Sequence, residues 1–138
     1  IVGEVGTDDI VNMLTYLAEQ EEHSMQLPPL KELYEAVARK TKINPLEILK
    51  ESKAIEQRIR RTVGAAMNNI ATLGVVDYTN PEFEYYAPRY FEFSEIRTVM
   101  KAIQDETTPK KVKINVKKFL QVLYIESNEK FNNNSSKM

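Results

Sequence analysis

The longest helical pattern in the sequence lies in residues 52–73, which read SKAIEQRIRRTVGAAMNNIATL. Apolar side chains recur in it at steps of three and four residues: Ile55, Ile59, Val63, Ala66, Ile70 and Leu73. An α-helix turns once every 3.6 residues, so this spacing places them on one stripe that faces a core. The pattern predicts a long amphipathic helix that ends at Gly74.

Three helix signals precede this stretch. Thr7, followed by two aspartates, predicts the start of a helix that fades near residue 22. Two consecutive prolines then separate it from a second helix, over residues 30–41. Asn44 before Pro45 predicts a third start, a short helix over residues 45–51 that is either separate from the long helix or continuous with it.

The patterns after Gly74 are also helical. Asn80 before Pro81 predicts another helix start, and two further amphipathic patterns follow, near residues 94–103 and 115–128. The aromatic residues between 83 and 93 are expected to fill the core, because few basic residues interleave them as a stacking platform for nucleic acid would require. We therefore expect an all-α fold, a helical bundle containing a helix-turn-helix.

Composition excludes many functions. The 138 residues suffice for one domain, with no cysteine, a single histidine (His23) and four scattered glycines. These counts exclude thiolate and histidine-rich metal sites, a cysteine nucleophile and a glycine-rich phosphate loop. The acidic pairs stand at helix ends, where the helix dipole explains them. We expect no catalytic residues, no metal and no cofactor; no membrane-spanning segment is found, and we expect a cytoplasmic protein.

The net charge of −1 conceals a division into blocks. Residues 37–61 carry eight basic and three acidic side chains, and residues 109–138 carry seven lysines and two glutamates. Two basic segments on a nearly neutral domain are what a surface for a polyanion requires, although ordinary solvated helix faces have a similar composition. The candidates for phosphate contacts are Lys40, Lys42, Lys50, Lys110, Lys111 and Lys113, with Lys117 and Lys118 nearby.

The side of the long helix opposite its apolar stripe predicts a DNA-reading surface. The candidate DNA-binding residues are Lys53, Gln57, Arg58, Arg60 and Arg61, with Arg58 on the flank. Arginine can hydrogen-bond guanine with two donors, and glutamine can do the same to adenine in the major groove. The preceding helix and turn, residues 30–44, would complete a helix-turn-helix. The alternative is a helical protein–protein interaction module whose basic face meets an acidic partner.

Two motifs carry a family resemblance. Residues 33–40, LYEAVARK, and residues 54–63, AIEQRIRRTV, resemble the helix-turn-helix of the sporulation master regulator's effector domain. The longer strings PPLKELYEAVA, IEQRIRRTVGAAMNNIATLG and FSEIRTVMKAI are closer to the YcbB/GlnL-type output domain of Bacillus-like response regulators of glutamine utilisation. This resemblance covers about residues 7–125. The chain departs from the sporulation regulator by a longer segment, residues 42–52, between the two helices.

The resemblance implies the output domain of a two-component response regulator. Residues 1–6 would then be the end of a linker from a receiver domain, residues 7–129 the DNA-binding domain, and residues 130–138 a disordered tail. It implies a homodimer on double-stranded DNA with two half-sites, driven by phosphorylation of the receiver domain by a sensor kinase.

Overall fold

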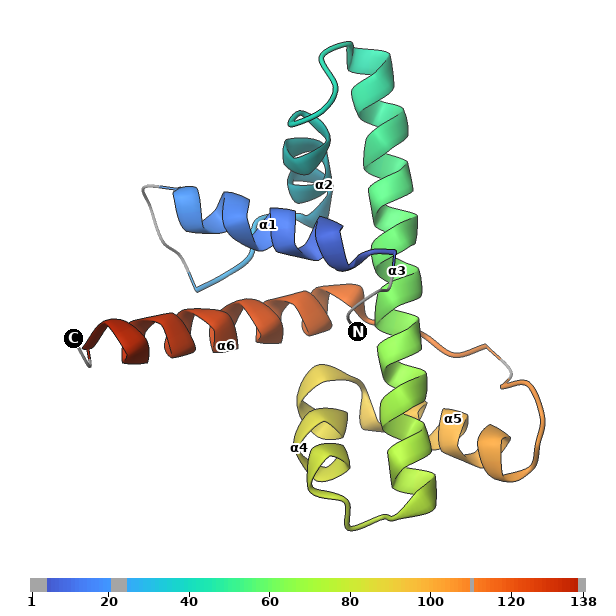
Figure 1. Cartoon of the computed structure of the whole chain (residues 1–138). Helices are drawn as coiled ribbons and strands as arrows, with labels where there is room; N and C mark the ends of the chain where they lie inside the picture. The colour runs from blue at the N-terminus through green and yellow to red at the C-terminus, as the bar shows by residue number, and fades with distance from the viewer. Residues whose placement is uncertain (1–4, 21–24, 110, 137–138) are drawn as a thin grey trace. The chain divides into compact units, whose positions relative to one another are not determined.

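The computed structural model of the chain describes residues 5–20, 25–109 and 111–136. Six helices follow one another along it: α1 (Thr7–Glu19), α2 (Leu30–Ala38), α3 (Pro45–Val76), α4 (Pro81–Tyr90), α5 (Phe93–Gln104) and α6 (Val116–Ser136) (Figure 1). No strand occurs within these described ranges, and the expectation of an all-α fold is confirmed. None of the helices in the described part of the chain is long and apolar enough to cross a membrane.

The helices belong to two compact units. One unit is built from Ile1–Thr62 and Leu123–Met138, and the other from Val63–Val122. The long helix α3 and the last helix α6 each contribute residues to both units.

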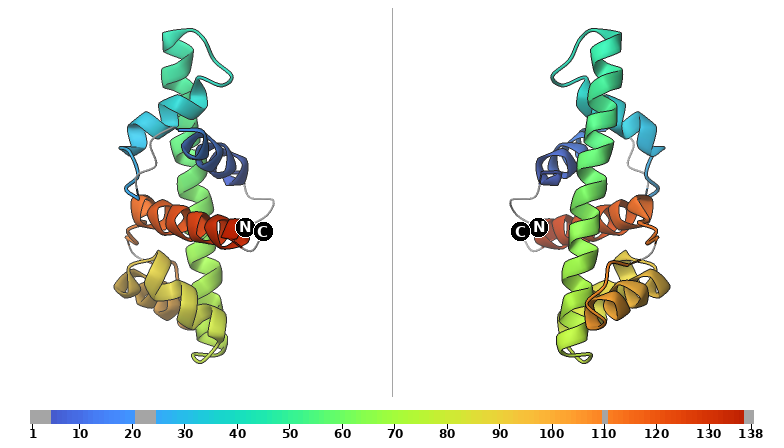
Figure 2. Two further views of the ribbon diagram at one scale, coloured as in Figure 1. Left: turned by 90° about the vertical axis from the view of Figure 1, so that its left-hand side faces the viewer. Right: turned by 90° about the vertical axis from the view of Figure 1, so that its right-hand side faces the viewer.

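The first unit holds α1 and α2 beside the N-terminal half of α3 (Figure 2). Each helix buries its apolar stripe, as Met13 of α1, Leu33 of α2 and Ile59 of α3 illustrate, each no more than 1% exposed. The two short helices pack against each other. This packing fixes which side of α3 faces the core and which side faces solvent.

The helix α3 is continuous from Pro45 to Val76, so residues 45–51 are not a separate element. Its first turn is capped by Asn44, whose side-chain oxygen accepts a hydrogen bond from the N–H of Leu46 at 2.8 Å. The hydroxyl of Ser52 donates back to the carbonyl oxygen of Ile48 at 2.8 Å, so that serine does not cap a new helix there.

Aromatic side chains fill the core of the second unit. Phe83, Tyr90 and Phe91 are at most 5% exposed, which confirms their expected place in the core, whereas the expectation is wrong for Tyr85 and Tyr86, which are 41% and 40% exposed. The ring of Phe119 on α6 lies 5.2 Å from that of Tyr90 and 5.7 Å from that of Phe91. Asn80 caps α4 as expected, because its side-chain oxygen accepts hydrogen bonds from two N–H groups of the first turn.

Two helix ends differ from the prediction. The helix α3 passes through Gly74, which is buried because the ring of Phe83 occupies the space that a Cβ would need. A close packing contact, and not a helix stop, thus explains this glycine. The helix α6 continues to Ser136 where a disordered tail was expected from residue 130, since each added residue of an established helix gains one backbone hydrogen bond.

Candidate nucleic-acid interface

One side of the N-terminal half of α3 is exposed and basic. We call it the basic stripe, and its members are Lys53, Gln57, Arg60 and Arg61, all exposed. At 3.6 residues per turn these four positions fall within about 100° of the helix circumference. Ile55 and Ile59 point the other way and are at most 2% exposed. The structure therefore brings four of the five predicted DNA-binding residues onto one accessible face.

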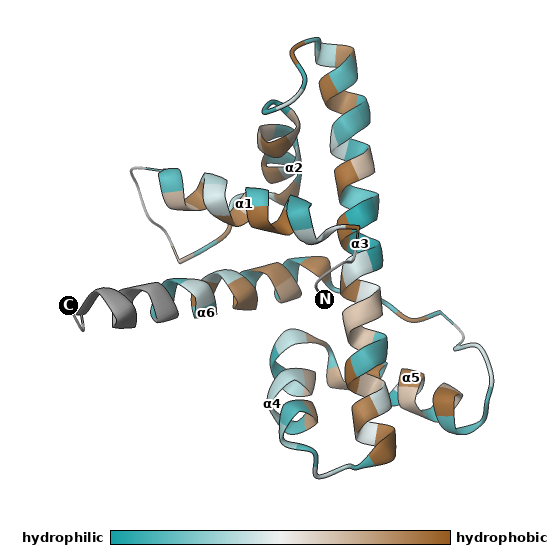
Figure 3. Ribbon diagram, viewed as in Figure 1, coloured by the Kyte–Doolittle hydropathy of each residue, from teal (hydrophilic) through white to brown (hydrophobic). Residues whose placement is uncertain are grey.

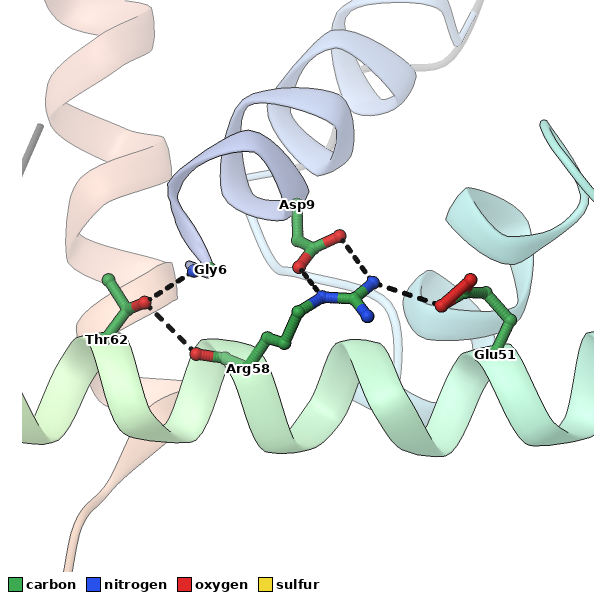
Figure 4. Close-up of polar contacts among 5 residues, drawn as sticks. All are labelled: Gly6, Asp9, Glu51, Arg58 and Thr62. Carbon is green, nitrogen blue, oxygen red and sulfur yellow. Dashed lines mark hydrogen bonds and ion pairs between the residues drawn. The ribbon is translucent and has the colours of Figure 1, made fainter. Parts of the chain in front are cut away.

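Arg58, the fifth predicted residue, has its charge matched within the first unit. Its Nε donates to Oδ2 of Asp9 at 2.7 Å, and its Nη2 donates to Oδ1 of Asp9 and Oε1 of Glu51, both at 3.1 Å (Figure 4). The hydrogen bonds to Asp9 and then to Glu51 raise the pKa of the guanidinium further above its ordinary value. Arg58 thus joins α1 to α3.

The start of α1 is joined to α3 a second time, one helical turn further along. The N–H of Gly6 donates to Oγ1 of Thr62 at 2.8 Å, and that hydroxyl donates to the carbonyl oxygen of Arg58 at 3.1 Å (Figure 4). A Cβ on Gly6 would lie 2.5 Å from the same carbonyl oxygen, so only glycine allows this approach. The preceding residue, Val5, is 56% exposed.

The basic stripe borders an open hollow of about 480 Å³. The hollow is lined by Val5, Lys53, Ala54, Gln57, Arg58 and Arg61. The exposed cations of Lys53 and Arg61 and the amide of Gln57 therefore lie beside the apolar side chains of Val5 and Ala54. Such a set can bind phosphate oxygens or hydrogen-bond acceptors on base edges.

Arg60 lies on the flank of the stripe that faces α2. Burial raises the pKa of Tyr34 on α2 to about 12, the negative charge of Glu56 adds to the rise, and the positive charge of Arg60 opposes it. The guanidinium of Arg60 is exposed, and so remains accessible to a ligand.

Three of the predicted phosphate contacts surround the start of α3. Lys40 and Lys42 lie in the turn between α2 and α3, and Lys50 lies on the second turn of α3. Lys50 is exposed and Lys42 is half-buried. The Nζ of Lys40 donates to the carbonyl oxygen of Asn12 at 3.5 Å, a long hydrogen bond that leaves the ammonium exposed.

The other predicted phosphate contacts belong to the second unit. Lys111 and Lys113 are exposed in the segment before α6, and the backbone N–H of Lys113 donates to Oε2 of Glu95 at 3.1 Å. Lys110 lies outside the described residues, as does His23.

The second unit has an open hollow of its own, of about 830 Å³. Its charged lining residues are Arg97, Lys101 and Asp105. In the described part of the chain, no group of three or more histidine, aspartate or glutamate side chains could hold a metal ion.

Sequence reasoning missed the apolar residues exposed at the start of α3. Ile43 is 94% exposed, Leu46 60% and Leu49 45%. The sequence left open whether residues 45–51 form a separate helix or continue into the long one, so it did not place these side chains on a particular side. Once α3 is continuous, helical spacing alone places Leu46 and Leu49 in line with Lys53, on the exposed side.

Comparisons with known proteins place the chain in context. A family model described as the YcbB domain matches residues 1–123. The chain is 39% identical over 135 residues to the transcriptional regulatory protein GlnL of Bacillus subtilis (strain 168). This similarity covers 92% of the chain and 43% of GlnL, so the chain spans less than half the length of that relative. No solved structure matches the chain.

Proposed function

The chain belongs to the YcbB domain family, and on this premise we propose that it is a sequence-specific DNA-binding domain of a transcription regulator. In this proposal α2, the turn after it and α3 act as a helix-turn-helix, and α3 enters the major groove. A relative named as a transcriptional regulatory protein supports the regulatory role.

The basic stripe is the observation that carries the proposal. Among the residues that the structure describes, Lys53, Arg60 and Arg61 form no ion pair, whereas the neighbouring Arg58 has two carboxylate partners. Cations held on one face without acidic partners favour a polyanionic ligand. We therefore assign Lys53, Gln57, Arg60 and Arg61 to DNA contacts and Arg58 to the fold.

The lysines near the stripe would hold the DNA backbone. Lys40, Lys42 and Lys50 stand where the turn and first helical turns would approach phosphates, and the lysines of residues 110–113 would add contacts from the second unit. These contacts would fix the orientation of α3 without reading sequence.

The proposal extends to the assembly that such a domain would serve. GlnL is longer than the chain. In the proposal, the full-length regulator also has a receiver domain, and its phosphorylation by a sensor kinase would drive homodimerisation on two DNA half-sites. The protein would act in the cytoplasm, as a regulator without catalysis or cofactor. The competing function is a protein–protein interaction module, which the exposed leucines of α3 also suit.

Fluorescence anisotropy would test the proposal directly. A duplex selected from random DNA and a scrambled duplex are titrated with the native chain, the Arg60→Ala/Arg61→Ala variant and the Arg97→Ala/Lys101→Ala variant. The last variant removes the same charge from an exposed face of the second unit. We expect the native chain to prefer the selected duplex, the first variant to lose this preference, and the second variant to retain it.

Salt dependence gives an independent measurement. If binding uses three phosphate contacts, the affinity should fall about 40-fold when the salt concentration rises from roughly 50 to 200 mM. Equal affinity of the native chain for both duplexes would contradict sequence-specific binding and leave only a basic surface, and no binding even at the lower salt concentration would favour the interaction module.

A further inference from the structure

We propose that Leu46 and Leu49 of α3 contact the 5-methyl groups of thymines in the major groove, so that thymines form part of the DNA sequence recognised. This inference rests on the proposed function and names the residues and the chemical group that would contribute specificity beyond the basic stripe.

The N-terminal turns of α3 are the part of the helix that would enter the major groove. A recognition helix contacts base edges mainly with the residues of its N-terminal turns. Here those turns begin at Pro45, capped by Asn44, and they project beyond the end of α2 in Figure 1. Residues 45–61 span about 24 Å, roughly twice the width of the major groove. The first turns would therefore lie deepest in the groove, and Arg60 and Arg61 would contact bases and phosphates nearer its edge.

Leu46 and Leu49 lie on the same side of α3 as Lys53. Leu46 precedes Lys53 by seven residues, which is close to two full helical turns, so the two side chains point the same way. Leu49 lies about 40° to the other side of this line. A helix that presents Lys53 and Gln57 to DNA must present these leucines as well.

The exposure of the leucines shows that the fold does not use them. Leu46 is 60% exposed, Leu49 45% and the adjacent Ile43 94%. Figure 3 shows hydrophobic segments at this end of α3 although no other described helix covers them. Three neighbouring apolar side chains left in solvent are typical of a binding surface.

The charge around the leucines identifies the occupant. Lys42, Lys50 and Lys53 flank them; the acidic residues in the same turns are Glu47 and Glu51, and Glu51 is paired with Arg58. A second copy of the chain would bring the same lysines face to face, which is unfavourable. A ligand must offer dense negative charge beside small apolar groups. The major groove offers both, as phosphates and thymine methyl groups.

The test replaces thymine by deoxyuridine, which lacks only the 5-methyl group. Each thymine of the selected duplex is replaced in turn, and binding is measured for the native chain, for Leu46→Ala/Leu49→Ala and for Val11→Ala. Alanine is the strongest helix former, so the double variant retains α3. Val11 is an apolar residue of α1 that is 53% exposed, and Val11→Ala serves as the matched control.

We expect deoxyuridine at one to three positions to weaken binding of the native chain by about fourfold for each methyl group removed. Val11→Ala should show the same losses. The leucine double variant should bind the thymine duplex more weakly and show no further loss with deoxyuridine.

Three results would overturn the inference, and they differ in what they leave standing. Native binding that is selective but indifferent to deoxyuridine would leave the proposed function and remove the thymine contact. Binding without any sequence preference would remove both. Sedimentation that shows the free native chain to be dimeric and the leucine double variant monomeric would instead assign Leu46 and Leu49 to an interface with a second copy.

Discussion

The guanidinium of Arg58 holds both carboxylate oxygens of Asp9, with Nε to Oδ2 at 2.7 Å and Nη2 to Oδ1 at 3.1 Å. The side chain of Asp9 is 10% exposed and that of Arg58 32% exposed, so this pair is partly shielded from water. It joins positions that are 49 residues apart in the sequence.

Arg58→Ala should therefore destabilise the fold. Its removal leaves the shielded carboxylate of Asp9 without its partner, and we expect the free energy of unfolding to fall by about 2 kcal/mol. Urea denaturation followed by circular dichroism measures this change. Arg58→Lys retains the charge but cannot donate to both oxygens in the same way. Its free energy of unfolding should lie between those of Arg58→Ala and the native chain.

The matched comparison is Arg60→Ala/Arg61→Ala, which removes exposed cations from the same helix. Its stability should stay within about 0.5 kcal/mol of the native value. Equal stability of Arg58→Ala and the native chain would contradict a structural role for Arg58.

Gly6→Ala should also weaken the first unit. The added methyl group would lie 2.5 Å from the backbone carbonyl oxygen of Arg58, so the backbone must move and the hydrogen bond to Thr62 must lengthen. We expect a loss of about 2 kcal/mol in the free energy of unfolding. Val5→Ala, a change at an exposed neighbour, is the control and should be close to neutral. A thermal midpoint of Gly6→Ala equal to that of the control would refute the prediction.

Tyr34 makes stability depend on alkaline pH. Burial raises the pKa of Tyr34 from 10 to about 12 in the folded chain, so folding favours the protonated phenol. The stabilisation is fully present below about pH 10 and is lost as the pH rises toward about 12. Urea denaturation over this range should show a decline that is smaller in Tyr34→Phe. An identical decline in both proteins would assign the effect to the other tyrosines.

Asn44→Ala should fray the start of α3. The side-chain oxygen of Asn44 accepts from the N–H of Leu46, and losing such a cap costs about 1 kcal/mol. Hydrogen exchange should accelerate at the N–H of Leu46, and DNA affinity should fall along with it if the first turns meet the groove. Asn44→Ser retains a capping oxygen and should restore both. Unchanged exchange in Asn44→Ala would show that the cap is dispensable.

Local signals in the sequence predicted most of the helices. The proline after Asn44 and the proline after Asn80 marked true helix starts, because a cap and a pre-set backbone angle act within three residues. The step of four from Ile55 to Ile59 placed both in the core, and the basic stripe followed from the same periodicity.

What the sequence did not reveal depends on contacts between distant residues. Ser52 has the chemistry of a cap and of a back-bonded helical hydroxyl, and only the surrounding fold decides between them. Gly74 was read as a helix end, although the distant ring of Phe83 is what requires a glycine there. The partner of Arg58 could not be found from local spacing, so one structural arginine was grouped with the exposed ones.

The ion pairs of Arg58 lower the number of counterions that DNA binding would release. Between positions 53 and 61 the sequence carries four cations, but the charge of Arg58 is already neutralised by Asp9 and Glu51. Of these four, only Lys53, Arg60 and Arg61 can replace sodium or potassium ions along the phosphates. The electrostatic contribution of α3 to DNA affinity thus depends on Asp9 of α1 as well as on the arginines of α3.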